Sequence, residues 1–72
     1  MNFSNSKSEI VKRYEDRNDG YFDVNEISEV VDYYLRRLRT KDAKKAIEIG
    51  LQLHPDDWEL HYQKGRILLD LQ

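Results

Sequence analysis

The chain has 72 residues, of which 14 are acidic and 12 are basic, so its formal net charge is -2. This balance argues against a polycationic nucleic-acid binder and against a disordered acidic tail. Because the sequence has no cysteine, disulfide scaffolds, thiol enzymes and thiolate zinc sites are excluded. No apolar run has the length of a membrane span or a secretory signal, so we expect a cytoplasmic protein.

The first predicted helix runs from Lys7 to Arg17. Glycine and proline number only 3 and 1, and alternation of apolar and polar residues is rare, so we expect an all-α fold. Ser6 and Glu9 have the spacing of a capping box at the start of this helix. Its apolar stripe consists of Ile10, Val11 and Tyr14.

The second predicted helix begins at a stronger signal. Asp23 and Glu26 have capping-box spacing, and Phe22 and Ile27 have the spacing of a hydrophobic staple. Residues 18–22 therefore form the preceding turn. Acidic residues near the start and arginines near the end complement the helix dipole. The residues expected on the apolar stripe are Ile27, Val30, Val31, Tyr34 and Leu38.

The third predicted helix extends from Thr40, its expected cap, to Leu53, and His54 with Pro55 ends it. Its inward stripe is made mostly of small residues, which let helix axes approach closely. We therefore expect tight packing against its neighbours. The stripe consists of Ala43, Ala46, Ile47, Gly50 and Leu51.

The fourth predicted helix begins at Asp56, which pairs with Glu59, and continues towards the end of the sequence at Gln72. It has no later helix to cover its apolar side. We therefore expect the chain to be the front piece of a longer repeat protein, and in isolation to form a homodimer. Trp58 also lies on this helix, and the residues expected to mediate self-association are Leu60, Ile67, Leu68 and Leu71.

The spacing in the second and third helices resembles the tetratricopeptide repeat of bacterial proteins, a helix-turn-helix unit of about 34 residues. The residues that carry this resemblance are Tyr34, Ala43, Ile47, Gly50 and Pro55, followed by Gly65 in the next unit. The first half of the repeat departs from the family pattern. Its tryptophan, leucine and glycine positions hold Ile27, Val30 and Val31, Leu38 and Thr40 replace the turn glycine and a later aromatic residue, and His61 replaces the next tryptophan.

The resemblance covers about one and a half repeats and implies an antiparallel array of about four helices in an α-α superhelix. It divides the chain into an N-terminal segment over residues 1–22, a helix hairpin over 23–55, and the first helix of an incomplete repeat over 56–72. It also implies a non-enzymatic scaffold without a cofactor, whose first helices line a concave face that binds a protein or peptide. Transferred to this sequence, that partner-binding face consists of Asn25, Ser28, Glu29, Asp32, Leu35, Glu59, Tyr62, Gln63, Arg66 and Leu69.

The ligand that this face suits is a basic or mixed-charge peptide. In family members that bind a carboxylate terminus, lysine and asparagine occupy positions that hold Ser28 and Asp32 here. Asp32 would repel a carboxylate, and Tyr62 is the candidate anchor residue for a basic or mixed-charge peptide.

Two alternatives remain open at this point. The first is a small helical protein whose only activity is self-association. The second is a calcium-binding module, because residues 15–26 have the length of an EF-hand loop and several of its acidic residues. Glu15 and Arg17 oppose this interpretation, since they stand at the first and third ligand positions.

Residues 36–45 contain six basic residues and one acidic residue, which raises nucleic-acid binding as a minor alternative. Their positions at the end of one helix and on the outer face of the next favour a solvated surface. The two histidines, His54 and His61, do not have the spacing of a metal-binding pair, and no serine has the surroundings of a catalytic nucleophile. We therefore predict no catalytic and no metal site.

Overall fold

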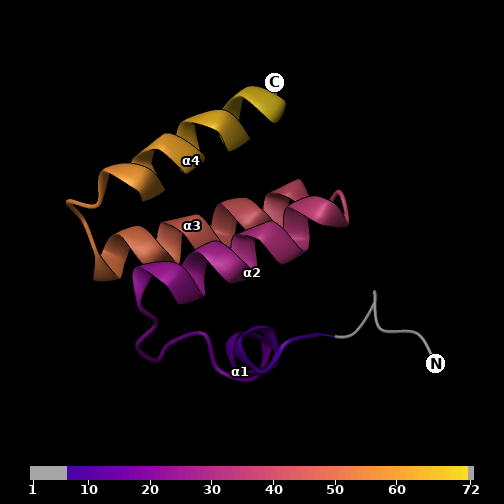
Figure 1. Cartoon of the computed structure of the whole chain (residues 1–72). Helices are drawn as coiled ribbons and strands as arrows, with labels where there is room; N and C mark the ends of the chain where they lie inside the picture. Colours follow the sequence, from indigo (N-terminus) through magenta and orange to yellow (C-terminus); the bar gives the residue numbers. More distant parts are fainter. Residues whose placement is uncertain (1–6, 72) are drawn as a thin grey trace.

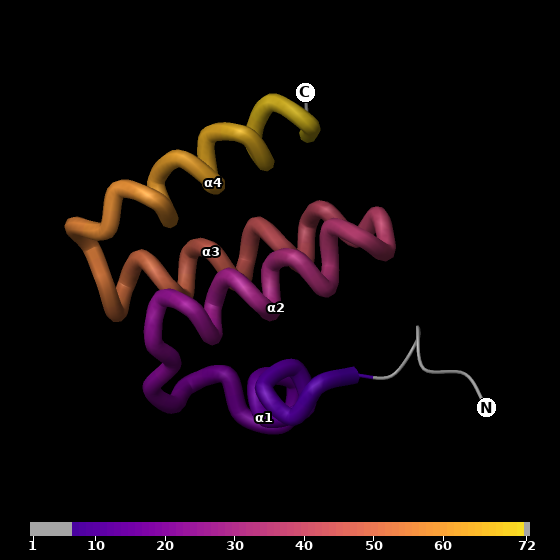
Figure 2. Tube along the Cα trace, in the orientation of Figure 1, coloured from indigo at the N-terminus to yellow at the C-terminus, as the bar shows by residue number. Residues whose placement is uncertain are grey.

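The computed structural model describes residues 7–71 and contains four α-helices in this part of the chain. They are α1 (Glu9–Asp16), α2 (Val24–Arg36), α3 (Thr40–Leu53) and α4 (Trp58–Asp70). Successive helices α2, α3 and α4 run in alternating directions, and α1 lies across the far side of α2 (Figures 1 and 2). The described residues contain no strand, so the predicted all-α fold of about four helices is confirmed.

The capping box predicted at the start of α2 is present in full. The Glu26 amide donates to Asp23 Oδ1 at 2.8 Å, and the Asp23 amide donates to Glu26 Oε1 at 3.0 Å. These two bonds satisfy backbone donors that the first helical turn would otherwise leave unpaired. The two staple residues, Phe22 and Ile27, are both buried in the core.

The other three helix starts differ from the prediction by one or two residues. Ser8 caps α1 by accepting from the Val11 amide at 3.2 Å, whereas Ser6 lies outside the described residues. Asp57, not Asp56, caps α4. At α3 the cap position is occupied by Arg39 and carries no side-chain cap, so the prediction that Thr40 caps this helix is wrong.

The core lies where α2, α3 and α4 meet. Small residues at the α2–α3 interface are fully enclosed, as predicted: Ala43 and Ala46 have no exposed surface, and Gly50 is buried. A methyl group at Gly50 would lie 2.7 Å from Ile27 Cγ2 and 3.3 Å from Leu60 Cδ1. Glycine is therefore needed here for close packing, because any larger side chain would have to displace buried neighbours.

Helix α1 is held to α2 by aromatic packing, by an ion pair and by a hydrogen bond between Tyr34 and Glu15. The ring of Tyr14 meets those of Phe22 and Tyr34 edge to face, with centroids 5.8 and 6.3 Å apart. At the surface, the Arg13 guanidinium pairs with the Glu26 carboxylate at 2.9 Å. The thin apolar stripe of α1 is thus sufficient to bury Val11 and Tyr14, since the aromatic cluster provides most of its packing.

The turn between α2 and α3 corrects the prediction for Leu38. This residue follows the end of α2, is 88% exposed and has a positive φ of 58°. Its amide donates to the Leu35 carbonyl at 3.0 Å, and the next amide, of Arg39, donates to the Tyr34 carbonyl at 2.9 Å. These two bonds form a Schellman motif, in which glycine is the usual residue at the left-handed position. Leu38 therefore belongs to the turn and not to the buried stripe.

The turn between α3 and α4 is tied back to the start of α2. α3 ends at Leu53, as predicted, and the His54 ring lies 2.8 Å from the Phe22 carbonyl through Nε2. The Tyr21 ring covers the same histidine edge to face, with centroids 5.5 Å apart. His61 Nε2 also lies 2.7 Å from the Pro55 carbonyl. Both histidines are thus partnered by backbone carbonyls.

Over residues 7–71, no helix has the length and apolar character needed to cross a membrane.

Candidate functional site

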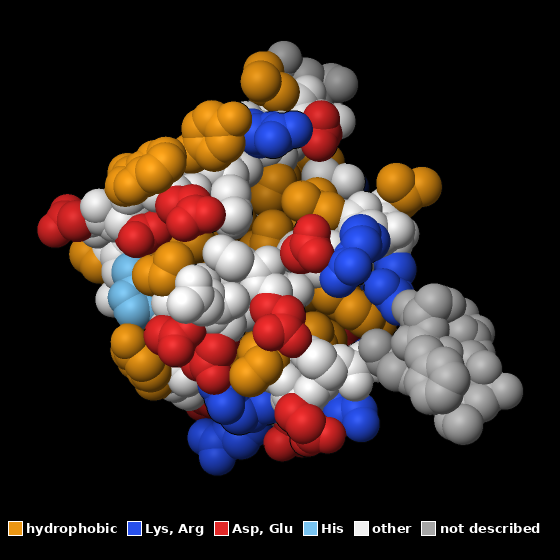
Figure 3. Space-filling view, viewed as in Figure 1, with side chains coloured by type: hydrophobic (Ala, Val, Ile, Leu, Met, Phe, Trp, Pro, Cys, Tyr) orange, Lys and Arg blue, Asp and Glu red, His pale blue; other side chains and the backbone are white. Residues whose placement is uncertain are grey.

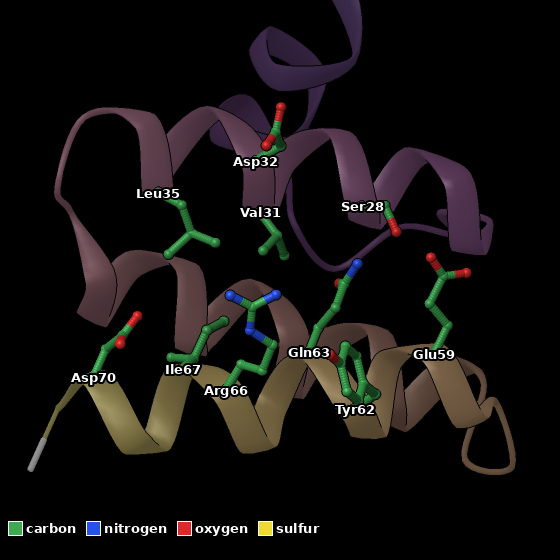
Figure 4. A pocket seen from close by; sticks show the side chains of 10 residues that line it. All are labelled: Ser28, Val31, Asp32, Leu35, Glu59, Tyr62, Gln63, Arg66, Ile67 and Asp70. Carbon is green, nitrogen blue, oxygen red and sulfur yellow. The ribbon is translucent and has the colours of Figure 1, made fainter.

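Helices α2 and α4 both pack on α3 (Figure 1), and a groove runs between them (Figure 4). Its volume is about 270 Å³. Buried Val31 and Ile67 contribute apolar surface to it, and polar side chains surround them. The residues that line it are Ser28, Val31, Asp32, Leu35, Glu59, Tyr62, Gln63, Arg66, Ile67 and Asp70.

The groove forms because each helix presents one stripe to it. On α2, Ser28, Asp32 and Leu35 follow one another at spacings of four and three residues, which brings them to one side of the helix. On α4, Glu59, Gln63, Arg66 and Asp70 follow one another at spacings of four, three and four residues, and Tyr62 lies next to them. In Figure 4, Leu35 of α2 points towards α4, and Gln63 and Arg66 of α4 point towards α2, whereas Asp32 lies on the outer side of α2.

Charge in the groove is mostly negative. Asp32, Glu59 and Asp70 are acidic and Arg66 is basic. Asp32 is partly neutralised by Arg36, whose Nη2 lies 3.0 Å from its carboxylate. An anionic ligand would meet like charge at several points along this groove, whereas a segment with several cationic side chains would find carboxylates at both ends of α4.

Two further features of the groove bear on ligand recognition. The ring of Tyr62 is more than half exposed and packs near Trp58, the only tryptophan of the chain, with centroids 6.4 Å apart. Gln63 carries a buried side-chain oxygen that has no hydrogen-bond partner among the described residues. An unpaired buried acceptor is costly, so a donor that reached it would be favoured.

Seven of the ten residues predicted for the partner-binding face line this one groove. Asn25, Glu29 and Leu69 do not, and each is exposed elsewhere on its helix. Conversely, the groove includes Val31, Ile67 and Asp70, which were not predicted for it. Val31 was predicted on the apolar stripe of the second helix and Ile67 among the self-association residues. Both lie in the core, with an edge towards the groove.

The four residues predicted for self-association are divided between the core and the surface. Leu60 and Ile67 are enclosed by the chain itself, so they are not available to a second molecule in this fold. Leu68 and Leu71 remain partly exposed, at 40% and 38%. Leu60 and Ile67 are buried because they lie two helical turns apart on the side of α4 that packs against α3.

A second, more polar pocket lies where α1 meets α2 and α3. The Tyr34 hydroxyl donates to Glu15 Oε2 at 2.6 Å, and Lys7 Nζ pairs with the other oxygen of the same carboxylate. The hydrogen bond from Lys7, and then that from Tyr34, lowers the pKa of Glu15 below its ordinary value. Burial, and then the bond to Glu15, raises the pKa of Tyr34. This network fixes α1 in place. The pocket is lined by Tyr14, Glu15, Asn18, Tyr34, Asp42 and Lys45.

The acidic residues of the proposed calcium loop point to other partners. Asp19 pairs with Arg17 at 3.3 Å, Glu15 is held by Lys7 and Tyr34, and Asp23 and Glu26 cap α2. Within residues 7–71, no three side chains of the types that ligate metals converge on one point.

The basic segment 36–45 is largely paired within the chain. Arg36 bonds Asp32, Arg39 bonds Asp42 at 2.8 Å, and Lys44 bonds Glu48 at 3.5 Å. The Arg37 guanidinium lies over the Tyr33 ring, 3.9 Å from its centroid. These contacts spread the cations over two helices and a turn, instead of gathering them into one patch.

Comparison of the chain with protein-family models, with curated proteins and with solved structures gave no match. What the protein does is therefore inferred from its own residues.

Proposed function

We propose that this protein is a non-enzymatic interaction module that binds a basic or mixed-charge peptide segment in the groove between α2 and α4. The observation that carries the proposal is a groove with a buried apolar floor, whose lining includes three acidic residues along its length and a tyrosine that is more than half exposed. Aromatic anchors and complementary charge are the features that most often give a peptide-binding surface its affinity and its specificity.

We also propose membership of the tetratricopeptide-repeat family. The support is the spacing of Tyr34, Ala43, Gly50 and Pro55 in the sequence. In that family the groove between the first helices of adjacent repeats receives the ligand. Here α2 and α4 would be those helices, which agrees with the position of the groove.

The test uses pairs of labelled peptides that are identical except that lysines in one are replaced by glutamates in the other. Fluorescence polarisation should show binding of the lysine form and little binding of the glutamate form. The fluorescence emission of Trp58 should change on binding, because its ring lies beside that of Tyr62, which lines the groove.

Asp32→Lys should weaken binding of the lysine peptide at least about tenfold, since it removes an attraction and adds a repulsion. Asp56→Lys is the matched control, because Asp56 is exposed and does not line the groove. Equal loss in both variants would show that the peptide responds to overall charge, and the proposal would then fail.

A further inference from the structure

The outer face of α4 carries an uncovered apolar stripe that is distinct from the predicted self-association residues. Trp58, Tyr62 and Leu69 are 75%, 58% and 68% exposed. With Gly65 they are spaced by four, three and four residues, which places all four on one side of the helix. Hydrophobic side chains accordingly gather along the edge of the molecule that α4 forms (Figure 3).

This stripe faces away from the core. Leu60 and Ile67, which α4 buries against the rest of the chain, are offset from it by about half a turn. At Gly65 an added methyl group would find nothing within 4 Å, so the middle of the stripe is an open, shallow notch. Large exposed side chains on both sides of such a notch are suited to packing against another helix.

The charges beside the stripe indicate which helix that is. Glu59 and Arg66 follow Trp58 and Gly65 by one residue each, so they lie about 10 Å apart along one flank of the stripe, the flank that borders the groove between α2 and α4. Neither forms an ion pair within residues 7–71. A two-fold axis that reverses α4 about the point between residues 62 and 63 exchanges positions 59 and 66. The flank is therefore complementary to itself when two copies pack antiparallel.

We infer that α4 associates with α4 of a second copy in this register. Arg66 of each copy faces Glu59 of its partner, which gives two equivalent ion pairs. Trp58 of one copy lies opposite position 67 of the other, between the partner's Gly65 and the partner's Leu69. Its ring therefore enters the notch at the partner's Gly65. The two Tyr62 rings meet at the axis. The same patch is used on both molecules, as an isologous dimer requires.

A single helix pair buries less than the roughly 1,200 Å² of a standard interface, so the dimer is weak and depends on concentration. Sedimentation equilibrium of the full chain, from micromolar to millimolar concentration, should show reversible dimer formation. Trp58→Ala should abolish it. Because Trp58 is mostly exposed, this substitution removes little core packing, and circular dichroism should remain unchanged.

Charge reversal provides the decisive experiment. Arg66→Glu and Glu59→Arg should each weaken self-association at least about tenfold, because each places like charges opposite one another. An equimolar mixture of these two variants should dimerise as strongly as the wild type, because both ion pairs then form in the mixed dimer, one with its original polarity and one with reversed polarity. Lys41→Glu and Glu29→Arg, exposed and away from this face, control for the same changes in net charge.

Recovery in the mixture would also prove that both variants are folded. A wild-type chain that stays monomeric at millimolar concentration would overturn the inference, as would single variants that dimerise normally or a mixture that fails to recover. No peptide is present in these measurements, so their outcome is independent of whether the groove binds one.

Discussion

Leu38 provides a sharp test of the turn between α2 and α3. A leucine at a positive φ of 58° brings its Cβ close to its own backbone, which costs about 1–2 kcal/mol relative to a residue without Cβ. Its side chain is almost fully exposed, so removing it sacrifices little buried surface. Glycine loses more conformational freedom on folding, at a cost of about 0.5–1 kcal/mol. The net expectation for Leu38→Gly is a stabilisation of about 0.5–1 kcal/mol.

The measurement is urea unfolding followed by circular dichroism, supported by thermal melts. For a domain of this size, the expected gain corresponds to a rise in Tm of about 2–8 °C. Leu38→Ala is the control, because alanine removes most of the side chain but keeps the Cβ that causes the strain. Its stability should stay close to that of the wild type. If alanine stabilised the protein as much as glycine, side-chain exposure and not backbone strain would be the cause, and the reasoning would be refuted.

Three further predictions concern packing, titration and capping. Gly50→Ala should destabilise the fold by about 1 kcal/mol, because overpacking against Ile27 outweighs the gain in helix propensity. Gly65→Ala should stabilise the fold by about 0.5–1 kcal/mol, because an added methyl group there meets open space. The midpoints of urea unfolding of the two variants should therefore shift in opposite directions from that of the wild type. A shift in the same direction would contradict the packing argument. The pKa of Glu15 is lowered in the folded state, so its ionised form stabilises the fold by about 0.5 kcal/mol after solvent screening. This stabilisation is present above the ordinary pKa of about 4.3 and is lost as the pH falls through the folded pKa. Thermal melts of Glu15→Gln should therefore lose less stability over that acid range, and a pH profile identical to that of the wild type would exclude this role. Asp23→Ala should cost about 0.5–2 kcal/mol in chemical unfolding, with the same loss whether or not calcium is present, and a calcium-dependent loss would revive the metal interpretation.

The helices could be predicted because local signals agree with one another. At the start of α2, the Asp23 and Glu26 pair, the flanking Phe22 and Ile27, and the helical spacing of apolar residues all indicate the same boundary. The start of α3 carries no such agreement. Thr40 has the right side chain for a cap, but the chain enters the helix through Arg39, and no side chain caps the first turn.

Leu38 shows a limit of periodicity. It continues the stripe of α2 at a spacing of four residues from Tyr34, so the pattern places it in the core. The helix has already ended at Arg36, because the Schellman bonds close the last turn and rotate the chain outward. The arginines indicate that the helix ends in this region, but without a glycine or proline in the turn no residue of the sequence marks the position of that ending.

The groove was easier to predict than the faces of α4. Ser28, Asp32 and Leu35 lie beside the apolar stripe of α2, next to Val31, so transfer from the family resemblance placed them in one groove. On α4, two apolar stripes share thirteen residues. Leu60 and Ile67 form one, and Trp58, Tyr62 and Leu69 form the other. A hydrophobic pattern gives both the same weight, because it records apolar character and not which neighbour covers it.

The choice between these stripes is made by packing volume at the centre of the molecule. Gly50 leaves space that the Leu60 side chain enters, and a methyl group there would lie 3.3 Å from Leu60 Cδ1. The bulky ring of Trp58 could not occupy that space without separating α3 from α4. The small residue on α3 thus selects the aliphatic stripe of α4 for the core and leaves the aromatic stripe outside. A substitution that enlarges position 50 should therefore disturb α4 as well as α2, and hydrogen exchange on Gly50→Ala should show faster opening of both helices. Protection that fell only in α2 would mean that α4 is positioned by contacts other than this one.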